Sequence, residues 1–358
     1  MNIDMNNILQ KFNISSRIEE YGNGHINDTY LTSSGNHILQ RINTGIFKDP
    51  EKLMDNIDRV TAFLRKKIEQ EGGDPERGTL TVIKTLDGKN YYKLDDEHCF
   101  RVYNFVNDTI TIEDSKDPGD LHSAGEGFGH FQKLLSDFPA DELFETIENF
   151  HNTPSRVADL KRAAEEDKAG RAAQVREEID FALSCASFAD KVVKGLEDGS
   201  IPLRVTHNDT KINNILFDKD TRKAICVIDL DTVMPGSALY DFGDALRMGA
   251  STAAEDEVNL DIVNFDKIAF EGFAKGYLSE MKDSLTETEI RLLPFSAKLL
   301  TYECGIRFLT DYLNGDTYFK IHRENHNLDR ARNQFKLVRD IETKEDMLGE
   351  IIERLIAQ

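Results

Sequence analysis

Short apolar segments separated by turns fill the first third of the chain, and helical repeats of apolar residues fill most of the rest. Within 17–44, alternating positions are interrupted by glycine- and asparagine-rich turns, which predicts three strands. Further strands are predicted at 80–84 and 98–106, the second being rich in aromatic and β-branched residues. A helix is predicted over 50–70, because a proline opens a stretch with apolar residues three and four positions apart.

Helical periodicity dominates beyond this region. Apolar residues step by three and four through 121–135, and small apolar residues do the same through 182–196. The charged, alanine-rich segment 158–180 predicts a solvated helix. Short β-like runs interrupt the helices within 200–235, and Pro294 predicts the first turn of a later helix.

Together these patterns predict an α+β fold of two lobes. The chain has 358 residues, more than a typical single domain. We expect a small β-rich N-terminal lobe over 1–106 and a large, mainly helical C-terminal lobe over 107–358. Two lobes of this kind can enclose a nucleotide, but only chemical motifs can indicate whether these do.

The charge of the chain narrows the classes of partner. Lys and Arg number 44 against 65 Asp and Glu, so the formal net charge is -21. Such a balance argues against nucleic acid or an anionic membrane surface as the main partner. No apolar stretch approaches the ~18 residues of a membrane span, and we expect no signal peptide in the opening MNIDMNNILQKF. We infer small-molecule ligands and no obligate protein partner.

Four cysteines are scattered along the chain, at Cys99, Cys185, Cys226 and Cys304. None are close enough in sequence to form a C-x-x-C pair. The spacing therefore predicts neither a disulfide nor a zinc site, and a reducing cytoplasm is the expected location.

The segment 203–249 carries the most chemical information. His207-Asn208-Asp209 is followed by Asn214, and Asp229 ends an apolar run. Phosphoryl transfer needs a carboxylate that orients the acceptor hydroxyl and takes its proton, together with a divalent metal that bridges the phosphates. Mg²⁺ prefers one or two carboxylates plus an amide oxygen. Asp209 is therefore the candidate base, and Asn214 and Asp229 are the candidate Mg²⁺ ligands.

The spacing also has an ordinary structural alternative. A D-x-x-x-x-N pattern alone is common, and HNDT could form a turn with an asparagine or aspartate cap. The apolar strand that ends at Asp229, at the distance found in protein kinases, favours the catalytic interpretation. Asp231 could simply end a solvated strand. For Asp241 and Asp244, capping of a helix and support of a loop are favoured over chemistry.

The H-x-D-x-x-x-x-N loop, the I-D-L-D strand and the downstream Y-D-F-G-D resemble the aminoglycoside phosphotransferase and choline kinase family. The longer runs 201–250 and 292–319, with YGNGHINDTYL near the start, resemble its N-acetylhexosamine 1-kinases over nearly the whole chain. The resemblance implies a two-lobe protein-kinase-like fold, with ATP as phosphate donor and Mg²⁺ as cofactor. It also implies transfer to the anomeric hydroxyl of N-acetylglucosamine or N-acetylgalactosamine.

The resemblance further implies where the nucleotide binds. Gly22 and Gly24 would cover the phosphates, because glycine lets the backbone approach closely, although most G-x-G pairs are hairpin turns. The strand exit at Tyr103 and Val106 would give backbone hydrogen bonds to the adenine edge, and strand core is an equal alternative for both. Gln40 stands where kinases usually carry a phosphate-binding basic residue. Its amide can donate a hydrogen bond but brings no charge.

For the sugar, the resemblance implies contacts from Asp231, Thr232, Arg307 and Tyr318. Arg307 lies four residues from both Glu303 and Asp311 along a predicted helix. The alternative for Arg307 is therefore a chain of surface ion pairs, each worth a few tenths of a kcal/mol.

Two other functions stay open. One is a small-molecule kinase that acts on another hydroxyl, such as that of an aminoglycoside, homoserine or a choline-like acceptor. The other is a catalytically weak nucleotide-binding module, which the uncharged Gln40 favours and which Asp209, Asn214 and Asp229 oppose. The sequence contains no Walker loop, no G-x-S-x-G and no H-E-x-x-H, which argues against the chemistries of those motifs.

Overall fold

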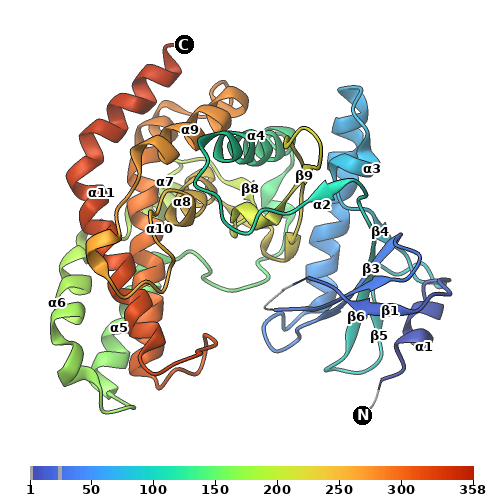
Figure 1. Ribbon diagram of the computed structural model, residues 1–358, viewed down its shortest axis with the longest axis horizontal. Coiled ribbons are helices and arrows are strands. Elements are labelled where there is room, and N and C mark those ends of the chain that lie inside the picture. The colour runs from blue at the N-terminus through green and yellow to red at the C-terminus, as the bar shows by residue number, and fades with distance from the viewer. Residues whose placement is uncertain (1–2, 23–25) are drawn as a thin grey trace.

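The N-terminal part of the chain forms an antiparallel sheet in the computed structural model, which describes residues 3–22 and 26–358 (Figure 1). The strands run in the order β1-β2-β3-β6-β4, and β5 pairs with β6. Their bounds are Ile18–Glu20 for β1, Asp28–Thr32 for β2, His37–Ile42 for β3, Val82–Ile83 for β4, Tyr92–Lys93 for β5 and Cys99–Asn104 for β6. The strands predicted within 17–44, 80–84 and 98–106 are confirmed.

Helices cover both faces of this sheet. The predicted helix over 50–70 is α2, Pro50–Gln70, which begins where Asp49 accepts the backbone N–H of Lys52. Its buried side chains share a core with Cys99 and Tyr103 of β6. The other face packs on α1, Met5–Gln10, which sequence periodicity did not reveal. Because side chains alternate along a strand, the faces of β6 are covered from two sides and its residues are nearly all buried.

The C-terminal part is mostly helical, so the predicted α+β fold of two lobes is confirmed (Figure 1). A short helix, α3 at Pro75–Gly78, belongs to the first part. The later helices are α4 at Pro118–Leu134, α5 at Thr153–Glu166, α6 at Arg176–Ser184, α7 at Lys191–Asp198, α8 at Ala238–Gly249, α9 at Lys267–Met281, α10 at Glu287–Leu313 and α11 at His326–Ile356.

Short strands interrupt these helices, as the runs within 200–235 predict. They are β7 at Thr109–Ile110, β8 at Arg204–Thr206, β9 at Ile215–Asp218, β10 at Ala224–Val227 and β11 at Met234–Gly236. One sheet has the order β10-β9-β7, and β11 pairs with β8. These strands fix both ends of the loop 207–214 and of the turn 228–233.

Three helix predictions were wrong in their boundaries. The expected helix over 158–180 is split, because α5 ends where Asp167 adopts a left-handed φ of 41°. Val157 and Leu160 of α5 are buried, so that helix is not solvated on every side. The periodic stretch 182–196 is likewise broken between α6 and α7. Periodicity continued across these breaks because the separate helices bury the same kinds of side chain.

Pro294 lies inside α10 rather than in its first turn. The helix begins seven residues earlier, where Thr286 and Glu289 form a capping box in which each side chain accepts the other residue's backbone N–H. A proline lacks the N–H that would close the bond to the carbonyl four residues before it. The cap therefore determines the start of α10, and the helix continues through the proline.

Two general features bear on function. In the described part of the chain, no helix has the length and apolarity needed to cross a membrane. Cys99 and Cys226 are buried, and both are free thiols like Cys185 and Cys304.

Helices α4 and α9 lie side by side at glycine contacts (Figure 1). A Cβ added to Gly276 of α9 would lie 1.9 Å from the carbonyl oxygen of His122. A Cβ added to Gly125 of α4 would lie 2.2 Å from the carbonyl oxygen of Phe273. Backbone rather than side chain blocks each position, so neither site can accommodate a methyl group without moving a helix.

We predict that Gly276→Ala destabilises the protein by at least about 1–3 kcal/mol, the usual cost of overpacking a core. Gly349→Ala in α11 is the matched control, since its Cβ would meet nothing within 4 Å. That change should stabilise the chain by about 0.5–1 kcal/mol, because alanine favours the helix. Urea unfolding midpoints measure both changes, and a neutral Gly276→Ala would contradict the packing argument.

Candidate functional site

A cavity of about 560 Å³ lies between the two lobes. One part of its lining is apolar and comes from the sheet and from β9 and the residues after β10: Ile26, Ile38, Leu80, Tyr103, Val106, Leu216 and Ile228. The other part is polar: Asn27, Gln40, Arg101, Asp209, Lys211, Asn214 and Asp229. An apolar pocket with a few convergent polar groups is the usual form of a small-molecule site.

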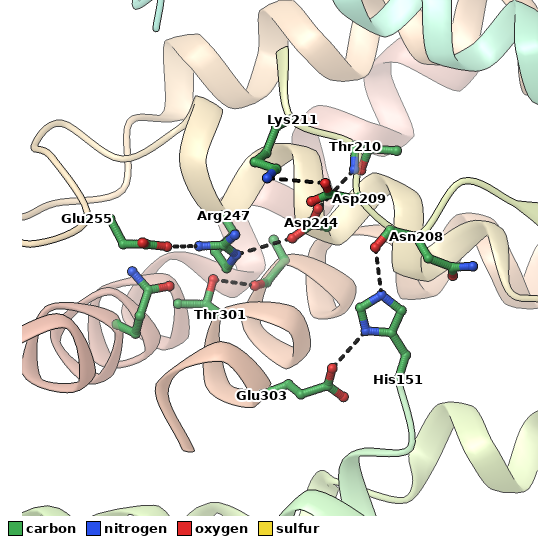
Figure 2. A network of polar contacts seen from close by, with 12 residues as sticks. His151, Asn208, Asp209, Thr210, Lys211, Asp244, Arg247, Glu255, Thr301 and Glu303 are labelled. Carbon is green, nitrogen blue, oxygen red and sulfur yellow. Dashed lines mark hydrogen bonds and ion pairs between the residues drawn. The ribbon is translucent and has the colours of Figure 1, made fainter. Parts of the chain in front are cut away.

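The loop after β8 brings the candidate base to this cavity. Asn208 has a φ of 65°, which turns the chain sharply before Asp209. The Nδ2 of Asn214 donates to the backbone oxygen of Asp209 at 2.8 Å and to its Oδ2 at 3.1 Å. The Nζ of Lys211 lies 3.1 Å from the same Oδ2 (Figure 2). Asp209 and Asn214 are therefore brought together, and Lys211 joins them.

Two aspartates of α8 hold this loop through hydrogen bonds to its backbone. Asp241 accepts the backbone N–H groups of His207 at 2.9 Å and Asn208 at 2.7 Å. Asp244 accepts the N–H of Thr210 at 2.9 Å. The prediction that both carboxylates support a loop is confirmed.

The sequence also suggested that these aspartates cap a helix, and this part of the prediction is wrong. The N-cap of α8 is Ser237. Their surroundings differ in charge. Burial raises the pKa of Asp241 against the opposing influence of His207. Burial also acts on Asp244, but Arg247, whose Nε lies 3.2 Å away, helps to hold the pKa of Asp244 below its ordinary value (Figure 2).

Asp229 follows β10 with a left-handed φ of 57°. Asp229 is solvent-accessible, and it lines the cavity between the lobes, whose walls surround it. Burial there, followed by the neighbouring carboxylates of Asp231 and Asp209, raises the pKa of Asp229 to about 6. His207 ties this turn to the loop through a 2.8 Å bond from its Nε2 to the oxygen of Ile228. Left-handed non-glycine residues are costly and gather at functional sites.

The donor atoms present fit Mg²⁺. The Nδ2 of Asn214 is used by Asp209, which leaves the amide oxygen for a cation. Together with the carboxylate of Asp229 this is the donor set that Mg²⁺ takes when phosphates supply further ligands. Among the residues described, no three His, Cys, Asp or Glu side chains gather as a self-sufficient metal site.

The structure gives Asp231 and Thr232 partners inside the protein. Asp231 pairs with Arg101 and accepts from the Nδ2 of Asn27 at 2.7 Å. The Oγ1 of Thr232 donates to the oxygen of His207 at 2.6 Å. Both residues are buried, and their predicted contact with a sugar stays a prediction.

The predicted nucleotide residues face the cavity as far as the structure describes them. Gly22 lines it with a φ of 73°, and Gly24 lies outside the described residues. Tyr103 and Val106 line the apolar part. Gln40 lines the polar part, and its Nε2 donates to Thr29 at 3.1 Å. Their contact with a nucleotide stays a prediction.

Arg101 was missed by sequence reasoning. It is paired in register with Gln40 on the neighbouring strand β6, and its side chain is almost fully buried. The signal was present, since an arginine within the otherwise apolar run FRVYNFV has to find a partner when the strand is buried.

A second group of residues adjoins the loop on the side of α10. The buried His151 lies between Glu303, 2.7 Å from its Nδ1, and the backbone oxygen of Asn208, 3.1 Å from its Nε2 (Figure 2). Burial opposes the charge of His151, but Glu303 outweighs it and raises the pKa of the imidazole. With acceptors at both nitrogens, His151 is a doubly donating imidazolium that joins α10 to the loop of Asp209.

Arg307 is one helical turn beyond Glu303 and stacks on Phe150 and Phe319, with its guanidinium carbon 5.6 and 5.5 Å from the ring centres. Tyr318 is 62% exposed beside Phe319. The alternative of surface ion pairs from Arg307 to Glu303 and Asp311 is therefore wrong, because the guanidinium lies against aromatic rings instead.

The two acidic residues of that alternative have other partners. Glu303 binds His151 and Thr153. Asp311 accepts backbone N–H groups of the loop that follows α10, including that of Tyr318 at 2.8 Å.

Arg156 is a further residue that the sequence did not reveal. Burial, and then the nearby charge of Arg307, lower the pKa of its guanidinium. Its Nε is buried without a hydrogen-bond partner among the described residues. Two arginines thus approach each other beside aromatic rings, an arrangement that a ligand with hydroxyl or carbonyl oxygens would satisfy.

Comparison with known proteins agrees with this geometry. The sequence pattern of the phosphotransferase enzyme family matches residues 17–276. An aminoglycoside phosphotransferase from Alicyclobacillus acidocaldarius is similar with a TM-score of 0.62 and 12% identity, over 99% of this chain and 97% of the other. A microcompartment-associated aminopropanol kinase gives 0.59 and 16%, over 96% and 98%. A Plasmodium vivax ethanolamine kinase gives 0.55 and 14%, over 92% and 83%.

At these identities the solved structures show the fold alone, and they confirm the two-lobe, kinase-like arrangement. The family match is more informative, because it covers more than half of the chain and includes the loop of Asp209 and the turn of Asp229. The chain therefore belongs to the phosphotransferase enzyme family.

Proposed function

We propose that this protein is a Mg²⁺-dependent kinase that transfers the γ-phosphate of ATP to a hydroxyl of a small sugar. The observation that carries the proposal is the convergence of Asp209, Asn214 and Asp229 at the polar part of a cavity between the lobes, whose other part is apolar. In this proposal residues 1–106 form the nucleotide-binding lobe, and 107–358 form the catalytic and acceptor-binding lobe.

Asp209 is the base in this mechanism. The bonds from Asn214 and Lys211 both fall on its Oδ2, which leaves Oδ1 to accept the proton of the acceptor hydroxyl. Burial depresses the pKa of Lys211, but Asp209 and Asp244 outweigh burial and raise it, so the ammonium stays charged. Held in this way, the carboxylate can orient the hydroxyl toward the phosphorus.

Asn214 and Asp229 would hold Mg²⁺ through an amide oxygen and a carboxylate. The bound ion would neutralise charge on the transferred phosphoryl group. Asp229 lies near Asp231 and Asp209, which makes its charge unfavourable without a cation. This repulsion supports a cation as the natural partner of the turn.

The nucleotide would lie along the sheet. Tyr103 and Val106 would contact the adenine in the apolar part of the cavity, and Gly22 with Gly24 would cover the phosphates. Gln40 would donate its amide toward them. We also place the enzyme in the cytoplasm, where ATP is available and thiols stay reduced.

The acceptor separates two candidate functions. The aminopropanol and ethanolamine kinases are named for amines, so an amino-alcohol or aminoglycoside acceptor is the alternative. A cationic acceptor would be repelled by Arg156 and Arg307, whereas a neutral sugar can accept their hydrogen bonds and pack on aromatic rings. We therefore favour the anomeric hydroxyl of an N-acetylhexosamine, with Arg307 and Tyr318 as contacts. For Asp231 and Thr232 the proposal is weaker, because their side chains have protein partners.

We predict that Asp209→Asn lowers turnover by about 10²- to 10⁴-fold, the usual contribution of general-base catalysis, while ATP still binds. Release of ADP with N-acetylglucosamine and calorimetric titration of ATP measure the two effects. Asp220→Asn, in the exposed turn between β9 and β10, is the control and should change neither. If Asp209→Asn retained turnover within a few-fold of the unchanged enzyme, the loop would not be catalytic.

Asp229→Ala should abolish activity and weaken MgATP binding, because it removes the carboxylate that would hold the metal. Binding of ATP in the presence of a chelator should change much less, since that affinity does not involve the ion. Titrations with and without Mg²⁺ make the comparison. Equal MgATP affinity and rate in the variant would reduce Asp229 to the end of a strand.

Arg307→Ala tests the acceptor. A charge-assisted hydrogen bond is worth roughly 1.5–3 kcal/mol, so kcat/KM for the N-acetylhexosamine should fall by about one to two orders of magnitude. The KM for ATP should stay unchanged. Arg339→Ala is the matched control. Arg339 also stacks on an aromatic ring, that of Phe181, but it belongs to α11 and not to the proposed acceptor site.

The same assay should include ethanolamine and an aminoglycoside as acceptors. Turnover of these amines in place of N-acetylhexosamines would reject the sugar assignment and retain the kinase. Unchanged acceptor kinetics in Arg307→Ala would remove Arg307 from the site.

A further inference from the structure

A buried ion pair joins the two lobes at the polar part of the cavity. Arg101 of β6 and Asp231 of the turn after β10 lie 2.5 Å apart, with only 1% and 4% of their side chains exposed. Asn27, the residue before β2, donates to the other oxygen of Asp231 at 2.7 Å. Both oxygens of this carboxylate are therefore held by the nucleotide lobe.

The ion pair extends across the sheet through Gln40. The Nε of Arg101 donates to the Oε1 of Gln40 at 3.0 Å, and the Nε2 of Gln40 donates to Thr29 at 3.1 Å. Gln40 and Arg101 are directly paired in register, so their side chains lie on the same face. The next residue, Arg41, lies on the opposite face and pairs with Asp28 at the surface.

This register explains why position 40 carries no charge. Like charges directly opposite each other on neighbouring strands are unfavourable. A basic residue at position 40 would lie beside the guanidinium of Arg101, whereas the glutamine both accepts from Arg101 and orients its own amide. The charge expected on β3 is thus found one strand away.

We infer that Arg101 is a positioning residue for MgATP. Its guanidinium supplies the positive charge that Gln40 lacks, and it fixes the turn of Asp229 through its ion pair with Asp231. The inference rests on the proposed kinase function. Asp231 is two residues from Asp229, so a bond that holds the first restrains the second. The pairing also balances a carboxylate that would otherwise repel the phosphates.

Removing Arg101 leaves Asp231 buried and unpaired, which is more damaging than removing both charges. Arg101→Met should therefore weaken MgATP binding by about tenfold, because the uncompensated carboxylate of Asp231 would repel the phosphates and would no longer restrain the turn of Asp229. The KM for the acceptor should change less than about threefold. The variant Arg101→Met/Asp231→Asn should recover part of the loss, because no buried charge remains unpaired.

A second rescue separates positioning from simple structural support. In Arg101→Met/Gln40→Lys the cation returns to β3, and MgATP affinity should rise again relative to Arg101→Met. Arg41→Met is the matched control, since it removes a surface arginine from the adjoining strand, and it should leave MgATP affinity unchanged. Calorimetry with MgATP, steady-state kinetics and melting curves on the full chain provide the readouts.

Unchanged MgATP affinity in Arg101→Met would overturn the inference. So would a rise confined to the KM of the acceptor, because Asp231 would then serve the sugar. If Arg101→Met fails to fold, the double variant Arg101→Met/Asp231→Asn replaces it in the test. Complete loss of MgATP affinity in that double variant, with no recovery when Gln40→Lys is added, would contradict the positioning role. Failure of the proposed function would look different. The unchanged protein would then show no phosphate transfer to any acceptor, whereas the comparison of MgATP affinities among the variants could still be made.

Discussion

Hydrogen bonds from the backbone of the loop 207–214 to two buried carboxylates of α8 are the interaction on which the site depends. This loop, with its left-handed residue Asn208, has few backbone groups satisfied by regular structure, and its buried N–H groups need fixed acceptors. Asp241 and Asp244 supply them. Their helix is itself packed against α10, so Asp209 is held by the core of the large lobe rather than by its own loop.

The second constraint is the concentration of negative charge in the cleft. Asp209, Asp229 and Asp231 are near one another, and each has a different means of compensation. Lys211 faces Asp209, and Arg101 neutralises Asp231. Asp229 has no such partner among the described side chains and carries the raised pKa. In the proposed mechanism this carboxylate is the one that binds the cation.

The sequence was sufficient for the two-lobe fold and for the proximity of residues within the loop 207–214, because both depend on local patterns. Alternation and helical spacing predicted the sheet and α2, and the spacing of Asp209 and Asn214 predicted their proximity. The run FRVYNFV signals that Arg101 needs a partner, but local patterns do not reveal which one, and they give no role to His151. The contacts of Arg101 with Asp231 and of His151 with Glu303 and Asn208 join residues that are 130, 152 and 57 positions apart. Helix breaks in 158–196 escaped for a related reason, since burial continues across them.

The position of His151 has a consequence for how the enzyme could be altered. Its imidazolium joins Glu303 of α10 to the carbonyl of Asn208, and Arg307 follows Glu303 by one turn and contributes to the lowered pKa of Glu303. The face of α10 that we propose for the acceptor and the loop of Asp209 are therefore linked electrostatically through His151. Under the proposed function, substitutions along α10 that change acceptor preference will also change the electrostatic field at Asp209. Acceptor selectivity and turnover rate are therefore coupled.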